Sequence, residues 1–382
     1  MSEFVYDVLI VGAGPAGSCA ALELAKHNFS VALLDKSTFP RDKICGDFVA
    51  GKGLRALKEI SPLAHERVLT FSEKAANKST HLYVGHFEPL LFHWTLPSFT
   101  IKREHFDNLL LEEALATQKL DFFPGDGVKA VSRSEELMLI TTQKGKNYRT
   151  KLVIGADGAH SVVARQLAGF QIDREHYGGS VRAYFTGVQN IQAAINEVYV
   201  HKSVVPGYFW LFPLSDTTAN VGVGMHSRHI TAHKVDLKAL FHRFIEENPV
   251  LKSKLGNATM QGSLSGFGLP FFSKKFTIHG DGFMLTGDAA SLIDTTNGEG
   301  IELAIVSGQM AAQTAIKALV AQDFSASNLA EYTERVHQKW WKQMQRKALI
   351  VKWGGDKYWL IHFTGWLALR LKFLARLLQK QV

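Results

Sequence analysis

The residues best suited to chemistry stand near the start of the chain, where a glycine-rich turn separates two apolar segments. Residues 6–11 form an apolar run rich in β-branched residues, and Gly12-Ala-Gly-Pro-Ala-Gly17 follows it directly. Residues 18–27 have a helical pattern, and a second apolar run, residues 30–34, ends at Asp35. This order of strand, Gly-x-Gly-x-x-Gly turn, helix, strand and acid predicts a dinucleotide-binding unit.

Each part of this unit has a physical role. Gly12 permits the tight turn, Gly14 lets the backbone approach a pyrophosphate, and Gly17 allows close packing of helix on strand. The helix N-terminus presents free N–H groups to the phosphates, and Asp35 accepts hydrogen bonds from ribose hydroxyls. The residues expected around the phosphates and ribose are Gly12, Gly14, Pro15, Ala16, Gly17, Asp35 and Lys36. The turn alone does not distinguish FAD from NAD.

Three later segments extend this pattern, two with a glycine–aspartate turn and one with a helix start. Residues 281–290 are typical of a strand that ends in a Gly287-Asp288 turn, and a long helical pattern runs to about residue 321. Residues 151–161 form another predicted strand and turn, which carries Asp157. Residues 102–110 are typical of a helix start and carry Arg103. Taken singly, a Gly-Asp or Asp-Gly turn is ordinary turn chemistry.

Together these segments resemble the glutathione-reductase-type FAD fold of the para-hydroxybenzoate hydroxylase superfamily, and within it the geranylgeranyl reductase family. The family-level similarity lies in Phe39-Pro-Arg-Asp-Lys-Ile-Cys-Gly46, in Val205-Pro-Gly-Tyr-Phe-Trp-Leu-Phe-Pro213, and in Gly298-Glu-Gly-Ile301 followed by Ser307-Gly308. It covers roughly residues 5–320 and implies FAD as the cofactor. Thr295-Thr296 depart from the family, which usually has a proline there.

The resemblance also implies roles for individual residues. Asp288, after Gly287, would bind a ribityl or ribose hydroxyl, and the main chain at Val128 would meet the adenine. Backbone N–H groups at Gly298, Gly300 and Ile301 would stabilise negative charge on the flavin, since a helix N-terminus favours an anion. The remaining predicted cofactor contacts are Arg41, Cys45, Gly46, Arg103 and Asp157, although Arg41 could equally form a surface salt bridge.

Cys45 has two interpretations. The family carries a cysteine near the substrate face of the flavin, which makes Cys45 a candidate catalytic or redox residue. A free cysteine is also a small buried hydrophobe in many proteins, and packing alone would explain it.

The candidate substrate pocket lies in a region of predicted strands, residues 165–275, which has no second glycine-rich phosphate loop. Alternate residues of a strand point to the same face, so Tyr208, Trp210 and Phe212 would form an aromatic wall about 13 Å long. Such a stripe could be sheet core, but the family resemblance favours a cavity lining. An aromatic wall suits a hydrophobic substrate, such as a prenyl chain, a quinone or a fused aromatic.

The predicted fold is α/β: a Rossmann-like FAD-binding domain, an inserted, mostly antiparallel β-sheet substrate domain and a C-terminal helical region. We place the discontinuous FAD-binding domain at residues 1–60, 100–165 and 276–325. The substrate domain takes residues 61–99 and 166–275, and residues 326–382 form the basic, tryptophan-rich helical region.

The net charge of +8 comes from the C-terminal region. Residues 335–382 hold eleven Lys/Arg and one acidic residue, so the rest of the chain is nearly neutral, which argues against a nucleic-acid partner. Residues 358–369 are the longest uncharged apolar run there, too short to span a bilayer. Tryptophans interleaved with basic residues favour binding to an anionic membrane surface, and the alternative is a helical hairpin packed on the body with a basic outer face.

The predicted enzyme is an FAD-dependent oxidoreductase that reduces C=C bonds of an isoprenoid or lipid-like substrate. NADPH or NADH would bind only transiently, or a protein donor would supply electrons. The alternative is an FAD-dependent monooxygenase of an aromatic or polyketide substrate, and a halogenase is a weaker variant. The histidines show no metal-binding pattern, so no metal is predicted. Two cysteines and no signal peptide indicate a cytoplasmic protein, either free or peripheral on a membrane.

Overall fold

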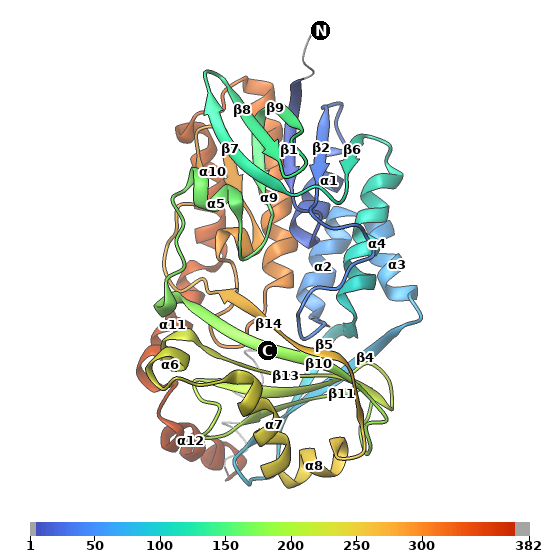
Figure 1. Cartoon of the computed structure of the whole chain (residues 1–382), viewed down its shortest axis with the longest axis vertical. Helices are drawn as coiled ribbons and strands as arrows, with labels where there is room; N and C mark the ends of the chain where they lie inside the picture. Colours follow the sequence, from blue (N-terminus) through green and yellow to red (C-terminus); the bar gives the residue numbers. More distant parts are fainter. Residues whose placement is uncertain (1–4, 371–382) are drawn as a thin grey trace.

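Two eight-stranded β-sheets organise the molecule, and each gathers strands from distant parts of the chain (Figure 1). The computed structural model describes residues 5–370. The first sheet and its helices fill one half of the molecule, and the second sheet crosses the other half (Figure 1). The predicted fold class, an FAD-binding α/β unit with an inserted sheet and C-terminal helices, is confirmed.

The first sheet has the order β15-β16-β9-β1-β2-β6, and its central strands run parallel. Strand β2 is apolar along its length and β1 is apolar apart from Asp7, as expected for parallel strands covered on both faces. The hairpin of β7 and β8 joins β9 antiparallel. The strands are β1 (Val5–Val11), β2 (Val31–Leu34), β6 (Leu120–Phe123), β7 (Val128–Ser134), β8 (Leu137–Thr142), β9 (Asn147–Gly155), β15 (His279–Gly280) and β16 (Phe283–Leu285).

The second sheet has the order β14-β10-β13-β12-β11-β4-β5-β3 and is antiparallel except for the β4–β11 pair. This sheet therefore combines strands from residues 48–101, which precede β6 in the chain, with strands from residues 177–270, which follow β9. Helices α7 (Leu237–Glu247) and α8 (Pro249–Leu255) pack on the face of this sheet that points away from the first (Figure 1). Its strands are β3 (Phe48–Val49), β4 (Lys74–Val84), β5 (Leu90–Ile101), β10 (Tyr177–Thr186), β11 (Ile195–Val200), β12 (Gly207–Pro213), β13 (Thr218–His226) and β14 (Thr259–Pro270).

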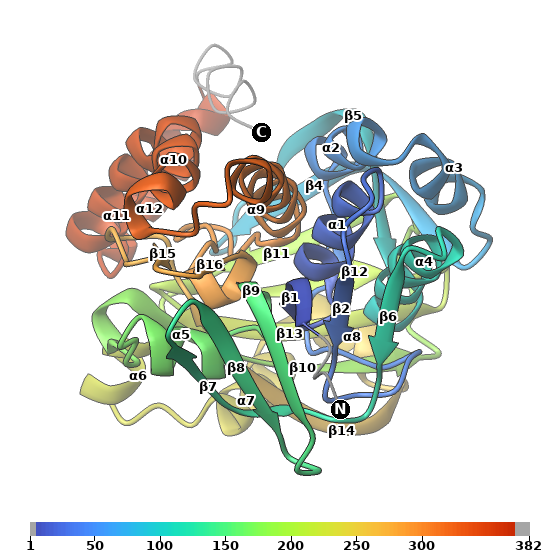
Figure 2. The same cartoon turned by 90° about the horizontal axis from the view of Figure 1, so that it is seen from above.

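The first helix packs against a helix from the far end of the chain. Helices α1 and α9 lie side by side (Figure 2). A Cβ at Gly308 of α9 would stand 2.2 Å from the Ala16 carbonyl oxygen of α1, so only glycine permits this approach. The helices are α1 (Pro15–Leu24), α2 (Gly51–Ile60), α3 (Pro62–Thr70), α4 (Arg103–Ala116), α5 (Val162–Leu167), α6 (Ser227–Ala232), α7 (Leu237–Glu247), α8 (Pro249–Leu255), α9 (Ile301–Ala321), α10 (Ala326–Val336), α11 (Lys342–Gly354) and α12 (Tyr358–Arg370).

The C-terminal helices begin inside the core and end on the surface. Tyr332 of α10 is fully buried and donates its O–H to the Leu285 carbonyl oxygen at 2.5 Å. Trp340, in the π-helical turn before α11, is buried in the same apolar core. Helix α12 then lies against β4, β5 and the turn between them, where the ring centroids of Phe87 and His362 are 4.4 Å apart. Residues 371–382 of the predicted membrane-binding segment lie outside the described residues.

One helix in the described part of the chain, α9, is long and apolar enough to cross a bilayer. Most of it is buried within the protein, as expected for a core helix.

Candidate active site

The glycine-rich turn has the geometry that the sequence predicts. Gly12 has φ +101°, and a Cβ there would stand 2.4 Å from the Ala156 carbonyl oxygen. A Cβ at Gly17 would stand 1.8 Å from the Gly12 carbonyl oxygen, so Gly17 serves close packing. Gly14 is the N-cap of α1 and has only the Arg41 side chain near its missing Cβ, at 3.5 Å. The first N–H groups of α1 therefore face open space, where a pyrophosphate could approach.

Asp35 organises the turn as well as facing the cavity. Its carboxylate accepts hydrogen bonds from the Ala13 N–H at 2.7 Å and from the Ser37 N–H at 2.8 Å. Both carboxylate oxygens keep lone pairs for ribose hydroxyls. The backbone N–H of Asp126 donates to the Asp35 carbonyl oxygen at 3.1 Å, which brings the segment before Val128 to the same end of the site. This end has the donors and acceptors that the adenosine half of a dinucleotide requires.

Three charged residues join two segments beside the turn. Arg103 holds Asp107 with two hydrogen bonds of 2.6 and 2.7 Å, and Arg41 pairs with the same carboxylate at 2.8 Å. Burial opposes the charge of Asp107, but Arg103 and Arg41 outweigh it and hold the pKa of Asp107 below its usual value. Arg41 therefore forms a largely buried ion pair, and its guanidinium also lies over the first turn of α1.

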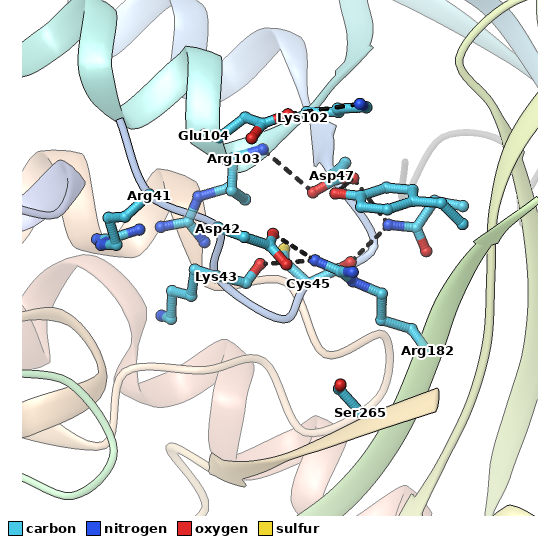
Figure 3. A network of polar contacts seen from close by, with 12 residues as sticks. Arg41, Asp42, Lys43, Cys45, Asp47, Lys102, Arg103, Glu104, Arg182 and Ser265 are labelled. Atoms are coloured by element: carbon cyan, nitrogen blue, oxygen red, sulfur yellow. Dashed lines mark hydrogen bonds and ion pairs between the residues drawn. The ribbon is translucent and has the colours of Figure 1, made fainter. Parts of the chain in front are cut away.

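The segment that carries Cys45 is fixed from both sides (Figure 3). Arg103 contacts the Cys45 thiol, and the Asn220 side-chain amide donates to the Cys45 carbonyl oxygen at 2.7 Å. Arg182 donates to Asp42 at 2.5 Å and to the Lys43 carbonyl oxygen at 3.3 Å. The Cys45 side chain is held at the cavity wall, which agrees with either a chemical or a packing role.

A fully buried carboxylate, Asp47, completes this network. It accepts hydrogen bonds from the Tyr184 hydroxyl at 2.7 Å and from the Asn220 amide at 2.8 Å. Burial raises the pKa of Asp47 to about 6, although Arg182 and these hydrogen bonds oppose the shift. Asp47 therefore joins the Cys45 segment to two strands of the second sheet.

The aromatic wall on β12 faces the cavity. The rings of Tyr208 and Trp210 lie 6.0 Å apart, and those of Trp210 and Phe212 lie 6.3 Å apart. The intervening residues, Phe209 and Leu211, point the other way into the core of the second sheet. The Trp210 indole N–H donates to Asn220 at 2.9 Å, so the same amide that holds Cys45 also orients the wall.

The loop before α9 is built around Asp294. Its carboxylate accepts hydrogen bonds from the Thr296 N–H at 2.8 Å and the Thr296 hydroxyl at 2.7 Å, and its carbonyl oxygen accepts from the Gly298 N–H at 3.0 Å. Lys347 of α11 forms an ion pair with the same carboxylate. Gly300 is the N-cap of α9 and has no side-chain cap, so the helix begins with free N–H groups at the cavity. This supports the anion-stabilising role that the resemblance implied.

Asp288 and Asp157 have protein partners of their own. Asp288 pairs with Lys43 at 2.8 Å, which joins the Cys45 segment to the turn after β16. Asp157 accepts from the Ser161 hydroxyl at 2.5 Å and the Val162 N–H at 2.6 Å, so it organises the turn into α5. Burial raises the pKa of Asp157, while these hydrogen bonds oppose the shift.

One continuous cavity of about 1110 Å³ brings the predicted residues together. It exceeds the roughly 300–1,000 Å³ typical of a pocket for one small ligand, so it has room for a cofactor and a substrate. Every predicted site residue lines it except Gly17, which only packs.

Sequence reasoning missed two parts of this cavity. Lys43, Arg182 and Asn220 connect its walls, and α11 and α12 contribute Ile350, Val351, Leu360, Ile361 and Thr364. Lys43 stands within the family string and could have been found there. Contacts of α11 and α12 with the cavity have no local sequence signal.

A profile of the FAD-binding domain family matches residues 5–221 of this chain. The chain belongs to this FAD-binding family, in its geranylgeranyl reductase branch. Menaquinone reductase of Mycobacterium tuberculosis (strain H37Rv) is 30% identical over 321 residues, which is 80% of this chain and 76% of the relative. Digeranylgeranylglycerophospholipid reductase of Thermoplasma acidophilum is 28% identical over 377 residues, covering 90% of this chain and 88% of the relative.

Solved structures agree with the family. A geranylgeranyl bacteriochlorophyll reductase-like protein from Thermoplasma acidophilum superposes with a TM-score of 0.80 at 25% identity, covering 92% of this chain and 88% of that one. A flavin-dependent brominase superposes with a TM-score of 0.74 at 20% identity, covering 92% and 91%, and shares the fold. This member of the geranylgeranyl reductase family is an FAD-dependent oxidoreductase.

The residues present fit FAD. The open approach to Gly14, the Asp35 carboxylate and the uncapped N-terminus of α9 supply sites for pyrophosphate, ribose and the negative edge of the flavin in one cavity. Lys43, paired with Asp288, brings an ammonium group to this wall.

Proposed function

We propose that the enzyme reduces carbon–carbon double bonds of an isoprenoid or similar lipid-like substrate. The observation that carries the proposal is the continuity of the cavity. It runs from the dinucleotide turn past the aromatic wall to the apolar side chains of α11 and α12. An elongated apolar molecule fits the aromatic and apolar part of this site, and the aromatic wall itself offers no charged partner to a small acid. The names of the two relatives, a menaquinone reductase and a digeranylgeranylglycerophospholipid reductase, also support an apolar substrate.

Reduced FAD, when bound, supplies the hydride for such a reduction. The chain's part is to position the alkene and to exclude water. Tyr208, Trp210 and Phe212 would hold an apolar chain against one side of the cavity, and Asn220 keeps Trp210 in its orientation. The Tyr208 hydroxyl donates to the Asn297 carbonyl oxygen, and burial holds the pKa of Tyr208 well above its usual value, so the phenol stays protonated at neutral pH.

The reductant is proposed to be NADPH or NADH bound transiently, or a protein electron donor. Support comes from the topology of the described residues, in which the second sheet is mostly antiparallel and carries no second dinucleotide-binding unit.

Anaerobic turnover tests the proposal against oxygenation. The FAD-loaded enzyme, chemically reduced and mixed with a polyprenyl substrate without oxygen, should give a product heavier by two hydrogens for each double bond reduced. A monooxygenase would instead be inactive without oxygen and would consume oxygen in step with substrate. Oxygen consumption in step with substrate, without anaerobic turnover, would contradict the proposal.

A further inference from the structure

Helices α11 and α12 carry apolar side chains on the outside of the molecule. Both helices lie at one side of the second sheet, away from α1 and the glycine-rich turn (Figure 1). Trp353 is 67% exposed, Trp359 is 69% exposed and Phe363 is 51% exposed. Soluble proteins seldom expose large aromatic side chains together without a partner. We call Ile350, Trp353, Trp359, Leu360, Phe363 and Trp366 the hairpin patch; each of them is exposed.

Helix α12 exposes its large aromatic side chains on one face. Trp359, Phe363 and Trp366 follow one another at intervals of four and three residues, so they share one face of the helix. Another face meets the protein: Tyr358 lies against His201, and Gly365 approaches Val84 closely. The helix therefore has one apolar face that binds the body and a second apolar face without a partner in the described residues.

The hairpin patch borders the cavity. Ile350 and Leu360 are exposed on the surface and also line the cavity, so its rim passes through the patch. Val351 and Ile361, beside them, line the cavity from the inner sides of the same helices. The two helices meet at the Gly354-Gly355 corner, which lines the cavity as well. An apolar molecule could thus pass from the outer surface to the aromatic wall along apolar side chains.

The charge around the patch identifies the occupant. Residues 339–370 carry seven Lys/Arg and a single acidic residue, Asp356. No carboxylate within residues 5–370 forms an ion pair with Arg346, Lys352 or Lys357. Basic side chains beside exposed tryptophans match an anionic lipid surface. A symmetric contact with a second copy would place these like charges against each other.

We propose that α11 and α12 dock on an anionic bilayer and that the cavity opens into that bilayer at Ile350 and Leu360. The apolar substrate then reaches the aromatic wall from the membrane without crossing water. The identity of the substrate rests on the proposed function, but the docking surface and the opening do not.

Vesicle binding of the FAD-loaded full chain tests the docking. Vesicles of phosphatidylglycerol with phosphatidylcholine should retain the protein, and vesicles of phosphatidylcholine alone should retain much less, with added salt reducing the difference. The affinity of the variant Trp353→Ser/Trp359→Ser/Phe363→Ser for the anionic vesicles should fall about tenfold or more. The matched control, Leu63→Ser/Ile172→Ser/Val320→Ser, removes exposed apolar side chains elsewhere and should bind like the wild type. Equal binding of the two variants would overturn the docking surface. The wild type could instead be a dimer that does not bind vesicles, with the patch variant a monomer. That result would assign the hairpin patch to self-association.

Turnover in two substrate forms tests the opening. With a long polyprenyl substrate embedded in anionic vesicles, the patch variant should lose about tenfold or more in rate. With a short prenyl alcohol dissolved in buffer, patch variant and wild type should be equal, since none of the three substituted side chains lines the cavity. An equal loss on both substrates would overturn the opening. If the wild type reduces neither the embedded nor the dissolved substrate, the proposed function is rejected. The docking surface is then still judged by the vesicle-binding experiment.

Discussion

Lys347 of α11 forms an ion pair with Asp294, in the loop that starts α9. The Asp294 side chain is 5% exposed, and it also fixes Thr296. Helix α11 thus holds the loop from which α9 begins with free N–H groups at the cavity.

The first prediction concerns this pair. Lys347→Met leaves a buried carboxylate short of one partner, which typically costs about 1–3 kcal/mol. We expect weaker FAD binding, measured by titration of flavin fluorescence, and a lower melting temperature. Asp294→Asn combined with Lys347→Met should cost less than the sum of the two single changes, because the unpaired charge is gone. Additive single and double changes would contradict a coupling between helix and loop.

Two glycines of the first turn should separate binding from folding. Gly14→Ala places a methyl group where only the Arg41 side chain is near, so the FAD-free protein should keep its stability. The dissociation constant for FAD should rise about tenfold or more, equivalent to about 1.4 kcal/mol or more. Gly17→Ala places its methyl group against the Gly12 carbonyl oxygen and should lower the melting temperature of the FAD-free protein. Calorimetry and FAD titration of both variants check that Gly14 serves FAD binding and Gly17 serves folding. A Gly17→Ala protein with the melting temperature of the wild type would show that the turn is looser than described.

Tyr208 should act partly through the backbone it binds. Tyr208→Phe keeps the ring at the aromatic wall and removes the hydrogen bond to the Asn297 carbonyl oxygen, which is worth about 1 kcal/mol. We expect FAD affinity to fall about fivefold, together with turnover. Tyr177→Phe is a suitable control, because the buried Tyr177 hydroxyl has no hydrogen-bond partner among the described residues. If the two variants behave alike, the hydrogen bond does not position the loop.

The buried Asp47 predicts a specific pH dependence of stability. Its pKa of about 6 in the folded protein lies above the value near 4 expected in the unfolded chain. Its contribution to stability is therefore complete below about pH 4 and is lost as the pH rises through about 6. Asp47→Asn lacks this titration, and Asn tolerates the φ of +63° at this position.

The melting temperature of the wild type, measured relative to Asp47→Asn, should fall between pH 4 and pH 7 and then level off. A constant difference over this range would show that folding does not change the pKa of Asp47.

The sequence was informative where chemistry is local in the chain. The turn from Gly12 to Gly17 and Asp35 share one strand–helix–strand unit, and their geometry follows from residue type and spacing. The alternation along β12 similarly predicted that Tyr208, Trp210 and Phe212 share a face. Such features depend on backbone conformations that a few neighbouring residues determine.

Contacts between distant segments had no comparable signal. Asn220 joins Trp210 to Cys45, yet a single asparagine in a strand has no pattern that announces this. The C-terminal tryptophans were predicted as one group, but Trp340 is core and Trp359 is exposed. The difference arises because α11 leaves the core after Met344, which packing determines and composition does not.

The cavity is bounded at one end by α1 and at the other by α11 and α12. More than three hundred residues of sequence separate these two ends of the cavity. Without α11 and α12, the cavity beside the glycine-rich turn would be open to water along one side. Closure of the cavity therefore requires segments from opposite ends of the described residues to fold together.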